Sequence, residues 1–262
     1  MKLRRSQPNH TIAVSFADSA APVVRTLDPD FSTDGLQSTD VGLATADQAY
    51  AVVVQPDGGI VLAGVTGYEG ALDFGAVRYL DDGTPDPAFG ANGRVAFAVS
   101  GSDDVARALA LQADGRLVLG GYTYTGAGIG FALARLNADG TADTAFGDQG
   151  RVITVTPGDV TLQARAVAVQ ADGRILLAGG GSAGFAIMRY TSAGVPDSSF
   201  GGDGLVTIHF SNGNDQCTGL AVQPDGRILL AGYSNGLVSD SVALARLEPD
   251  GALDATFGTN GT

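Results

Sequence analysis

Apolar residues in this chain come in short runs separated by steps rich in Gly and Asp, and one ten-residue phrase carries this pattern four times. It begins with Gln-x-Asp-Gly-x, continues with an aliphatic run and closes on Gly. Its copies are Gln55–Gly64, Gln112–Gly121, Gln170–Gly179 and Gln223–Gly232, with leading glutamines 57, 58 and 53 residues apart. A period of this length indicates stacked or radially arranged copies of one small structural unit.

Each copy shows the same succession of short elements. A strand rich in Ala and Val comes first: Ala49–Gln55, Ala106–Gln112, Ala164–Gln170 and Cys217–Gln223. The Asp-Gly step after it predicts a tight hairpin, and the aliphatic run predicts a second, buried strand. A third strand follows at Phe74–Tyr79, Phe131–Leu136, Phe185–Tyr190 and Val242–Leu247, and a fourth at Arg94–Val99, Arg151–Thr156 and Leu205–Phe210. No segment has a convincing helical period, so almost no helix is expected.

Four antiparallel strands per unit predict an all-β fold, a β-propeller of about four four-stranded blades. A tail of residues 1–26 precedes the repeat domain, residues 27–262, whose units are about 36–80, 81–136, 137–190 and 191–262. The last unit reaches its end before a fourth strand. The segment Leu36–Val41 is therefore expected to pair beside Val242–Leu247 and close the ring, which would hide a sheet edge. The alternative is an open arc of blades completed by oligomerisation.

A second recurring motif, Asp-x-x-Phe, occupies the turn after the third strand. Its copies are Asp28/Phe31, Asp86/Phe89, Asp143/Phe146, Asp197/Phe200 and Asp254/Phe257. Together with the Gln-x-Asp-Gly phrase, it resembles the delta-60 repeat family of bacterial β-propeller repeats, over roughly residues 27–258. The resemblance implies an extracellular or periplasmic location and supplies no catalytic motif. The first copy departs from the pattern, since Ser32 stands where the others have Gly.

Arginines recur at a constant distance from these turns. Arg78, Arg135, Arg189 and Arg246 each stand eight residues before the Asp of the motif, which is Asp86, Asp143, Asp197 or Asp254. A feature present in every copy is expected to belong to the scaffold, so one structural ion pair per blade is predicted. The recurring Phe residues are expected to fill the core.

The charge and composition exclude several classes of partner. A formal net charge of −13 over 262 residues repels nucleic acid and anionic membranes. No stretch of 18 apolar residues exists, so no membrane insertion is expected. Lys2, Arg4 and Arg5 resemble the start of an export signal, but the apolar region after them is poor. Cys217 is the single cysteine, so no disulfide within the chain is expected.

Motifs that could carry catalytic or metal chemistry have simpler structural interpretations. Gly179–Gly184 matches a dinucleotide-binding pattern, but a strand rather than a helix follows it, which favours a hairpin loop. His209 and Cys217 occupy strand positions that Ala fills in other copies, so no metal site or catalytic triad is predicted. No cofactor is predicted; the alternative is Ca²⁺ at the turn residues Asp82, Asp139 and Asp250.

Residues that differ between copies gather just before and within the Ala-rich strand. Asp47, Asp104 and Asp215 stand eight residues before the Gln, and three residues further on lie Tyr50, Arg107, Arg165 and Thr218. If this strand lines the axis, these residues ring one mouth of a central channel. The sequence predicts a non-enzymatic scaffold or binding module that holds a glycan, peptide or protein there. The alternative is a hydrolase or lyase acting on a polar substrate such as a glycan, with Asp47 and Asp104 as acid and base.

Overall fold

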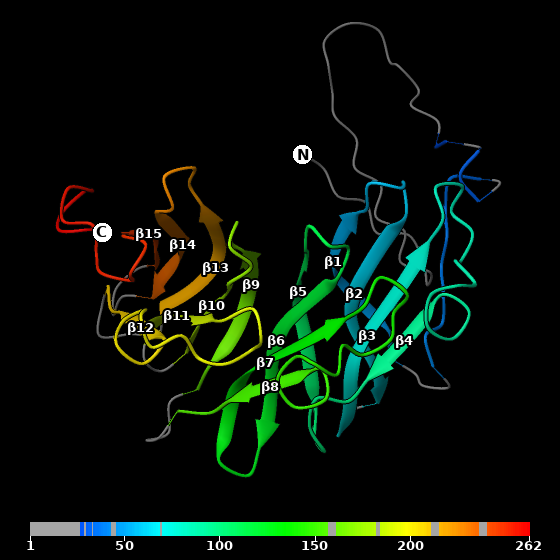
Figure 1. Ribbon diagram of the computed structural model, residues 1–262, viewed down its shortest axis with the longest axis horizontal. Helices are drawn as coiled ribbons and strands as arrows, with labels where there is room; N and C mark the ends of the chain where they lie inside the picture. The colour runs from blue at the N-terminus through cyan, green and yellow to red at the C-terminus, as the bar shows by residue number, and fades with distance from the viewer. Residues whose placement is uncertain are drawn as a thin grey trace, which may run out of the picture.

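The protein is an all-β repeat fold, seen here in a computed structural model (Figure 1). The structure describes residues 27–28, 30–32, 34–42, 46–68, 70–156, 161–181, 184–210, 215–235 and 240–262. The export-like tail predicted for residues 1–26 lies outside the described residues. None of the described residues forms a helix long and apolar enough to cross a membrane.

Fifteen strands in the described residues form four successive antiparallel blades, and a single pair between Gly181 and Asp215 joins the third and fourth into one seven-stranded sheet. Blade 1 contains β1 (Gln48–Val54), β2 (Ile60–Tyr68), β3 (Ala71–Tyr79) and β4 (Arg94–Phe97). Blade 2 contains β5 (Asp104–Leu111), β6 (Leu117–Thr125), β7 (Gly128–Leu136) and β8 (Arg151–Thr154). Blade 3 contains β9 (Gln163–Val169), β10 (Ile175–Gly181), β11 (Gly184–Tyr190) and β12 (Leu205–Ile208). Blade 4 contains β13 (Asp215–Val222), β14 (Ile228–Asn235) and β15 (Asp240–Leu247).

The blades are arranged as an open arc, with blade 1 at one end and blade 4 at the other (Figure 1). The first strands β1, β5, β9 and β13 lie on the inside of the arc, and neighbouring ones contact each other. Apolar side chains fill the space between successive blades, and Phe74, Phe131 and Phe185 there are fully buried. The small Ala and Val residues of the first strands fit this crowded inner position.

One joint links each blade to the next, and the Asp-x-x-Phe turn builds it. Phe89, Phe146 and Phe200 are fully buried. The Gly after each Phe donates its backbone N–H to a turn carbonyl of the following blade, as from Gly147 to Ala193 at 2.9 Å. The guanidinium of the strand-three arginine also reaches that turn, since Arg135 Nη1 lies 2.5 Å from Ser192 O. The repeated motif therefore serves as the connection between blades.

The predicted closure of the ring by Leu36–Val41 is wrong. Within the described residues β15 pairs only with β14. The segment lies instead on blade 1, where the Tyr79 hydroxyl donates to Thr39 Oγ1 at 2.7 Å. The reason is that Phe31 uses the same joint as the other motif copies, with Ser32 N–H donating to Asp82 O at 2.8 Å. Ser32 even adopts a left-handed φ of 50°, close to the 54° of Gly90, so the departure in sequence changes no geometry.

The outward face of blade 4 consequently has no blade against it among the described residues. Val242 is 93% exposed and Leu244 is 42% exposed, whereas Phe185 and Ile187, which hold the same places in blade 3, are fully buried. Completion of the arc by a second copy stays a prediction. We expect the apparent mass in light scattering to rise with protein concentration, and Val242→Asp to suppress that rise by placing a charge in the contact. A constant monomer mass for the unchanged chain would contradict it.

Each blade carries an ionic network near the hairpin between its first and second strands, and this network is larger than the predicted ion pair. Arg135 Nε and Arg189 Nε lie 2.8 Å from Asp143 Oδ2 and Asp197 Oδ2, and Arg246 Nε lies 2.6 Å from Asp254 Oδ2. Arg78 and Asp86 are paired as well. A second arginine, from the Asp-Gly-Arg step, joins the same carboxylates: Arg116, Arg174 and Arg227, at 3.1, 2.8 and 3.2 Å. In blade 1 Gly59 replaces this arginine, and Arg78 reaches Asp57 at 2.5 Å.

These networks predict loss of stability in acid. Hydrogen bonds from Ser199 and Thr256, reinforced by the arginines, hold the pKa of Asp197 and of Asp254 at about 2. Because the folded pKa values lie below the unfolded value of about 3.9, the stabilisation is complete above pH 4 and is lost as pH falls towards 2. We expect the melting temperature, followed by circular dichroism, to drop over this range. The drop should be shallower for Asp197→Asn; equal pH profiles would contradict the assignment.

Candidate ligand-binding site

A β-bulge interrupts the first strand of every blade at the same place. The register with the second strand shifts between Ala49 and Ala51, Ala106 and Ala108, Ala164 and Ala166, and Cys217 and Gly219. The residues inside the four bulges are Tyr50, Arg107, Arg165 and Thr218. A bulge leaves its extra residue outside the regular ladder and re-aims that side chain. The four positions whose residue varies between copies are thus the four at which the regular pairing of the first strand is interrupted.

The Gly that closes each repeated phrase makes the bulge possible. Gly64, Gly121, Gly179 and Gly232 sit beside the bulges, and a Cβ on any of them would overlap a backbone carbonyl oxygen of the first strand. For Gly121 that oxygen belongs to Val105, and for Gly179 it belongs to Gln163. The repeated Gly is therefore a requirement of close backbone approach. The Gly is the same in every blade, whereas the residue inside the bulge differs from blade to blade.

Between blades 1 and 2 the bulge residues border a pocket of about 300 Å³. It is lined by Ala46, Gln48, Tyr50, Val65, Leu72, Asp103, Val105, Arg107, Tyr122 and Tyr124. The Cζ atom of Arg107 lies 3.9 Å from the Tyr50 ring centroid and 6.0 Å from that of Tyr122. Arg107 Nε is buried and has no hydrogen-bond partner among the described residues. The pocket thus combines aromatic surface with a cation whose buried Nε has no hydrogen-bond partner among the described residues.

The charge of Asp103 adds to the polarity of this pocket. Asp103 Oδ1 accepts a hydrogen bond from Leu72 N–H at 2.9 Å, which ties β3 to the loop before β5. Burial is the main cause that raises the pKa of the Tyr124 phenol, and the charge of Asp103 adds to it. A tyrosine phenol is neutral near pH 7 even without this shift, so Tyr124 offers a hydroxyl group there. Tyr50 and Tyr124 remain exposed at 39% and 43%, so their rings are available to a ligand.

The three aspartates predicted to ring the channel mouth hold backbone instead. Asp104 is fully buried, and its Oδ2 accepts from Val99 N–H at 2.7 Å and from Ser100 N–H at 2.8 Å. Asp215 is also fully buried and accepts from Phe210 N–H at 2.8 Å, and Asp47 accepts from Val41 N–H at 2.9 Å. These carboxylates fix the loop that enters each inner strand. Because they bind backbone N–H groups, these aspartates do not belong to the candidate ligand site. Their contacts give no support to Asp47 and Asp104 as a catalytic acid and base.

A carboxylate that sequence reasoning missed lies on β3. Burial, and to a lesser degree the charge of Asp104, raise the pKa of Asp73 above its usual value. Asp73 pairs with Thr66 across β2 and β3 and occurs in one copy of the repeat only. Nothing in its sequence context separates it from a solvated strand residue, so only the fold could identify it.

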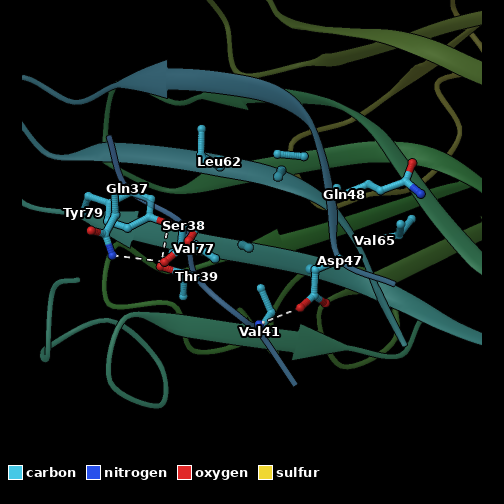
Figure 2. A pocket seen from close by; sticks show the side chains of 15 residues that line it. Gln37, Ser38, Thr39, Val41, Asp47, Gln48, Leu62, Val65, Val77 and Tyr79 are labelled. Atoms are coloured by element: carbon cyan, nitrogen blue, oxygen red, sulfur yellow. Dashed lines mark hydrogen bonds between the residues drawn. The ribbon is translucent and has the colours of Figure 1, made fainter. Parts of the chain in front are cut away.

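A second cavity, of about 180 Å³, lies where residues 37–41 cross blade 1 (Figure 2). Leu62, Val77 and Tyr79 form much of its floor, while Thr39 and Val41 lie across them in Figure 2. This is the face that the second and third strands of the other blades turn to the preceding blade. The cavity therefore arises because a single segment, rather than a whole blade, covers this face of blade 1. We consider it a weaker candidate for ligand binding than the bulge pocket.

The other motifs are placed as parts of the scaffold. Gly179–Gly181 end β10 and Gly184 begins β11, so no helix follows the glycines. Cys217 is buried, and desolvation raises the pKa of its thiol to about 12, so it remains protonated. Asp82, Asp139 and Asp250 accept from backbone N–H groups two residues on, at 2.8, 3.0 and 3.0 Å. In the described ranges no three His, Cys, Asp or Glu residues are grouped to hold a metal ion.

Comparison with known proteins agrees with the repeat and the fold. Residues 55–89, 112–146, 170–200 and 223–257, just over half of the chain, match a family model described as a domain of unknown function (DUF5122) β-propeller. This supports a propeller repeat family, although not the narrower delta-60 name. No curated protein matches the chain.

Among solved structures, the GH43 endo-arabinanase from Bacillus licheniformis matches with a TM-score of 0.41 and 13% sequence identity. The match covers 84% of this chain and 81% of that one. The prediction that the protein is non-enzymatic is withdrawn, because the matching structure is described as an enzyme and no finding shows that this chain lacks activity. At this identity and TM-score the match assigns no activity to this chain.

Proposed function

Because the chain belongs to the DUF5122 β-propeller family, whose repeat builds the scaffold, we propose that its function resides in the residues the repeat leaves variable. The proposed function is the binding of a glycan at the inner mouth of the arc, in the pocket bordered by Tyr50 and Arg107. The observation that carries it is the contrast between four equal bulges and their four occupants. Scaffold residues recur in every blade, whereas the bulge residues are Tyr, Arg, Arg and Thr.

The lining of the pocket favours a glycan over other polar ligands. Exposed tyrosine rings offer flat apolar surface, and aromatic side chains with a polar tip suit ligands that have one apolar face and wet edges. Gln48, Asp103 and the tyrosine hydroxyls supply donors and acceptors around these rings. A few convergent polar groups in an aromatic pocket are the usual make-up of a small-ligand site.

The test is a glycan array probed with the labelled protein, followed by titration of the best binder. We expect Tyr50→Ala to weaken binding by about tenfold, since it removes a stacking surface and a cation–π partner worth roughly 0.5–2 kcal/mol. Thr218→Ala is the matched control, because it changes the equivalent bulge of blade 4 outside this pocket. An array without binders, or equal losses in both variants, would contradict the proposal.

A further inference from the structure

Two arginines of the inner strands stand apart from the others in the described part of the chain. Seven arginines form ion pairs: Arg78, Arg116, Arg135, Arg174, Arg189, Arg227 and Arg246. Arg151 bonds backbone carbonyls, and Arg94 is exposed to solvent. Arg107 and Arg165 are half-buried, and their Nε atoms are buried without a hydrogen-bond partner.

This lack of partners is notable because carboxylates are abundant in the protein. The chain has 28 acidic residues against 15 basic ones, yet no described carboxylate lies within ion-pair distance of Arg107 or Arg165. A partly buried cation without an acceptor costs free energy, since its lost hydration is not replaced. An acceptor supplied by a ligand would recover that cost at the moment of binding.

The two arginines occupy the same structural position in neighbouring blades. Both sit in the bulge of a first strand, and β5 and β9 contact each other along the inside of the arc. The Cζ atom of the Arg107 guanidinium lies over the Tyr50 ring, 3.9 Å from its centroid. The N–H groups lie in the plane of a guanidinium, so stacking on its face leaves them available. Their fork matches the two oxygens of a carboxylate.

Resting on the proposed glycan site, we propose that its ligand is an acidic oligosaccharide whose uronate carboxylates bind Arg107 in the pocket and, beyond the pocket lining, Arg165 in the bulge of the next blade. Sugar rings would lie against Tyr50 and Tyr124, and hydroxyl groups would donate to Asp103. The position of Asp103 favours a saccharide over an acidic peptide. A peptide rich in carboxylates would meet this negative charge without hydroxyl groups to offer it.

Titration calorimetry with three probes of matched length tests the inference: a tetragalacturonate, its neutral methyl ester and a tetraglutamate peptide. We expect the tetragalacturonate to bind at least about tenfold more tightly than the ester, with the difference shrinking as salt is raised. Arg107→Gln and Arg165→Gln should each lower its affinity by about tenfold or more. Arg94→Gln, which changes the net charge equally from an exposed site, should leave the affinity within about twofold.

The outcomes distinguish a failure of the carboxylate assignment from a failure of the proposed glycan binding. Equal binding of the acid and the ester would overturn the carboxylate assignment while leaving a glycan site in place. Tighter binding of the peptide than of the tetragalacturonate would overturn the saccharide class. Should Arg107→Gln melt below the unchanged protein, Arg107→Lys serves instead: it keeps the charge and removes the planar fork, and an affinity like that of the unchanged protein would refute the paired contact.

Discussion

Gly121→Ala is expected to destabilise the protein by more than about 4 kcal/mol, a loss reserved for substitutions that break a specific structural requirement. The new Cβ would overlap the Val105 carbonyl oxygen, and both atoms belong to paired strands of the same blade. Backbone cannot yield as a flexible side chain can, so β5 and β6 would have to separate at the bulge. Urea unfolding followed by circular dichroism measures the effect, and a total stability of about 5–15 kcal/mol makes it visible.

Gly219→Ala is the control for this substitution. Gly219 also lies beside a bulge of a first strand, but a Cβ there would meet the Ala231 Cβ at 3.7 Å, an ordinary contact. The two variants add the same methyl group to comparable strands. We expect Gly219→Ala to shift the urea midpoint slightly. Similar midpoints for the two variants would show that the bulge does not depend on the Gly.

Arg135→Ala is expected to cost about 3–5 kcal/mol, the usual loss when one partner of a buried ion pair is removed. Arg135 binds Asp143, donates to Ser192 O in the next blade and lies 4.3 Å from the Phe146 ring. Its removal leaves the buried Asp143 carboxylate with the longer contact to Arg116 as its one ion pair in the described structure, beside the hydrogen bond from Ala145 N–H. Thermal unfolding should show the loss, while ligand affinity should be nearly unchanged, because Arg135 lies outside the pocket between blades 1 and 2.

Arg246→Ala provides an internal comparison for Arg135→Ala. It removes the same pair in blade 4, but the Arg246 side chain is 23% exposed against 8% for Arg135. No described residue of a following blade receives it, so a smaller loss of stability is expected. Equal losses would mean that the contact with the next blade contributes nothing to the effect of Arg135.

The repeat made much of the architecture predictable. Strands, hairpins and blade order follow from alternation and from Asp-Gly steps, which are local features. The pairing of Arg135 with Asp143 followed from a constant spacing in every copy, because recurrence within one chain marks scaffold. The same reasoning applied to Asp104 and Asp215 would have identified them as structural, since aspartate recurs at that place in three of the four copies.

Other features depended on contacts that a linear pattern does not contain. A bulge is a mismatch between two paired strands, so the sequence of one strand does not reveal it. Two sequence features of the bulge in blade 2 could have indicated it: Gly121, which is the same in every copy, and Arg107, at a position that varies. The prediction for Leu36–Val41 was wrong because it followed from the lack of a fourth strand in the last unit, whereas the joint that Phe31 makes with blade 1 decides where the segment lies. Asp73 carried no signal, because its neighbour Asp104 is distant in sequence.

The open arc that the described blades form has a mechanical consequence for binding. A terminal blade has one joint with another blade, so it can tilt by loosening that joint, whereas a middle blade must loosen two. The bulge pocket spans blades 1 and 2, so we expect its width to depend on the one joint between them. A ligand that bridges Tyr50 and Arg107 would stiffen that joint, and hydrogen exchange should slow across β1 and β2 on binding while β13 and β14 exchange at their former rate.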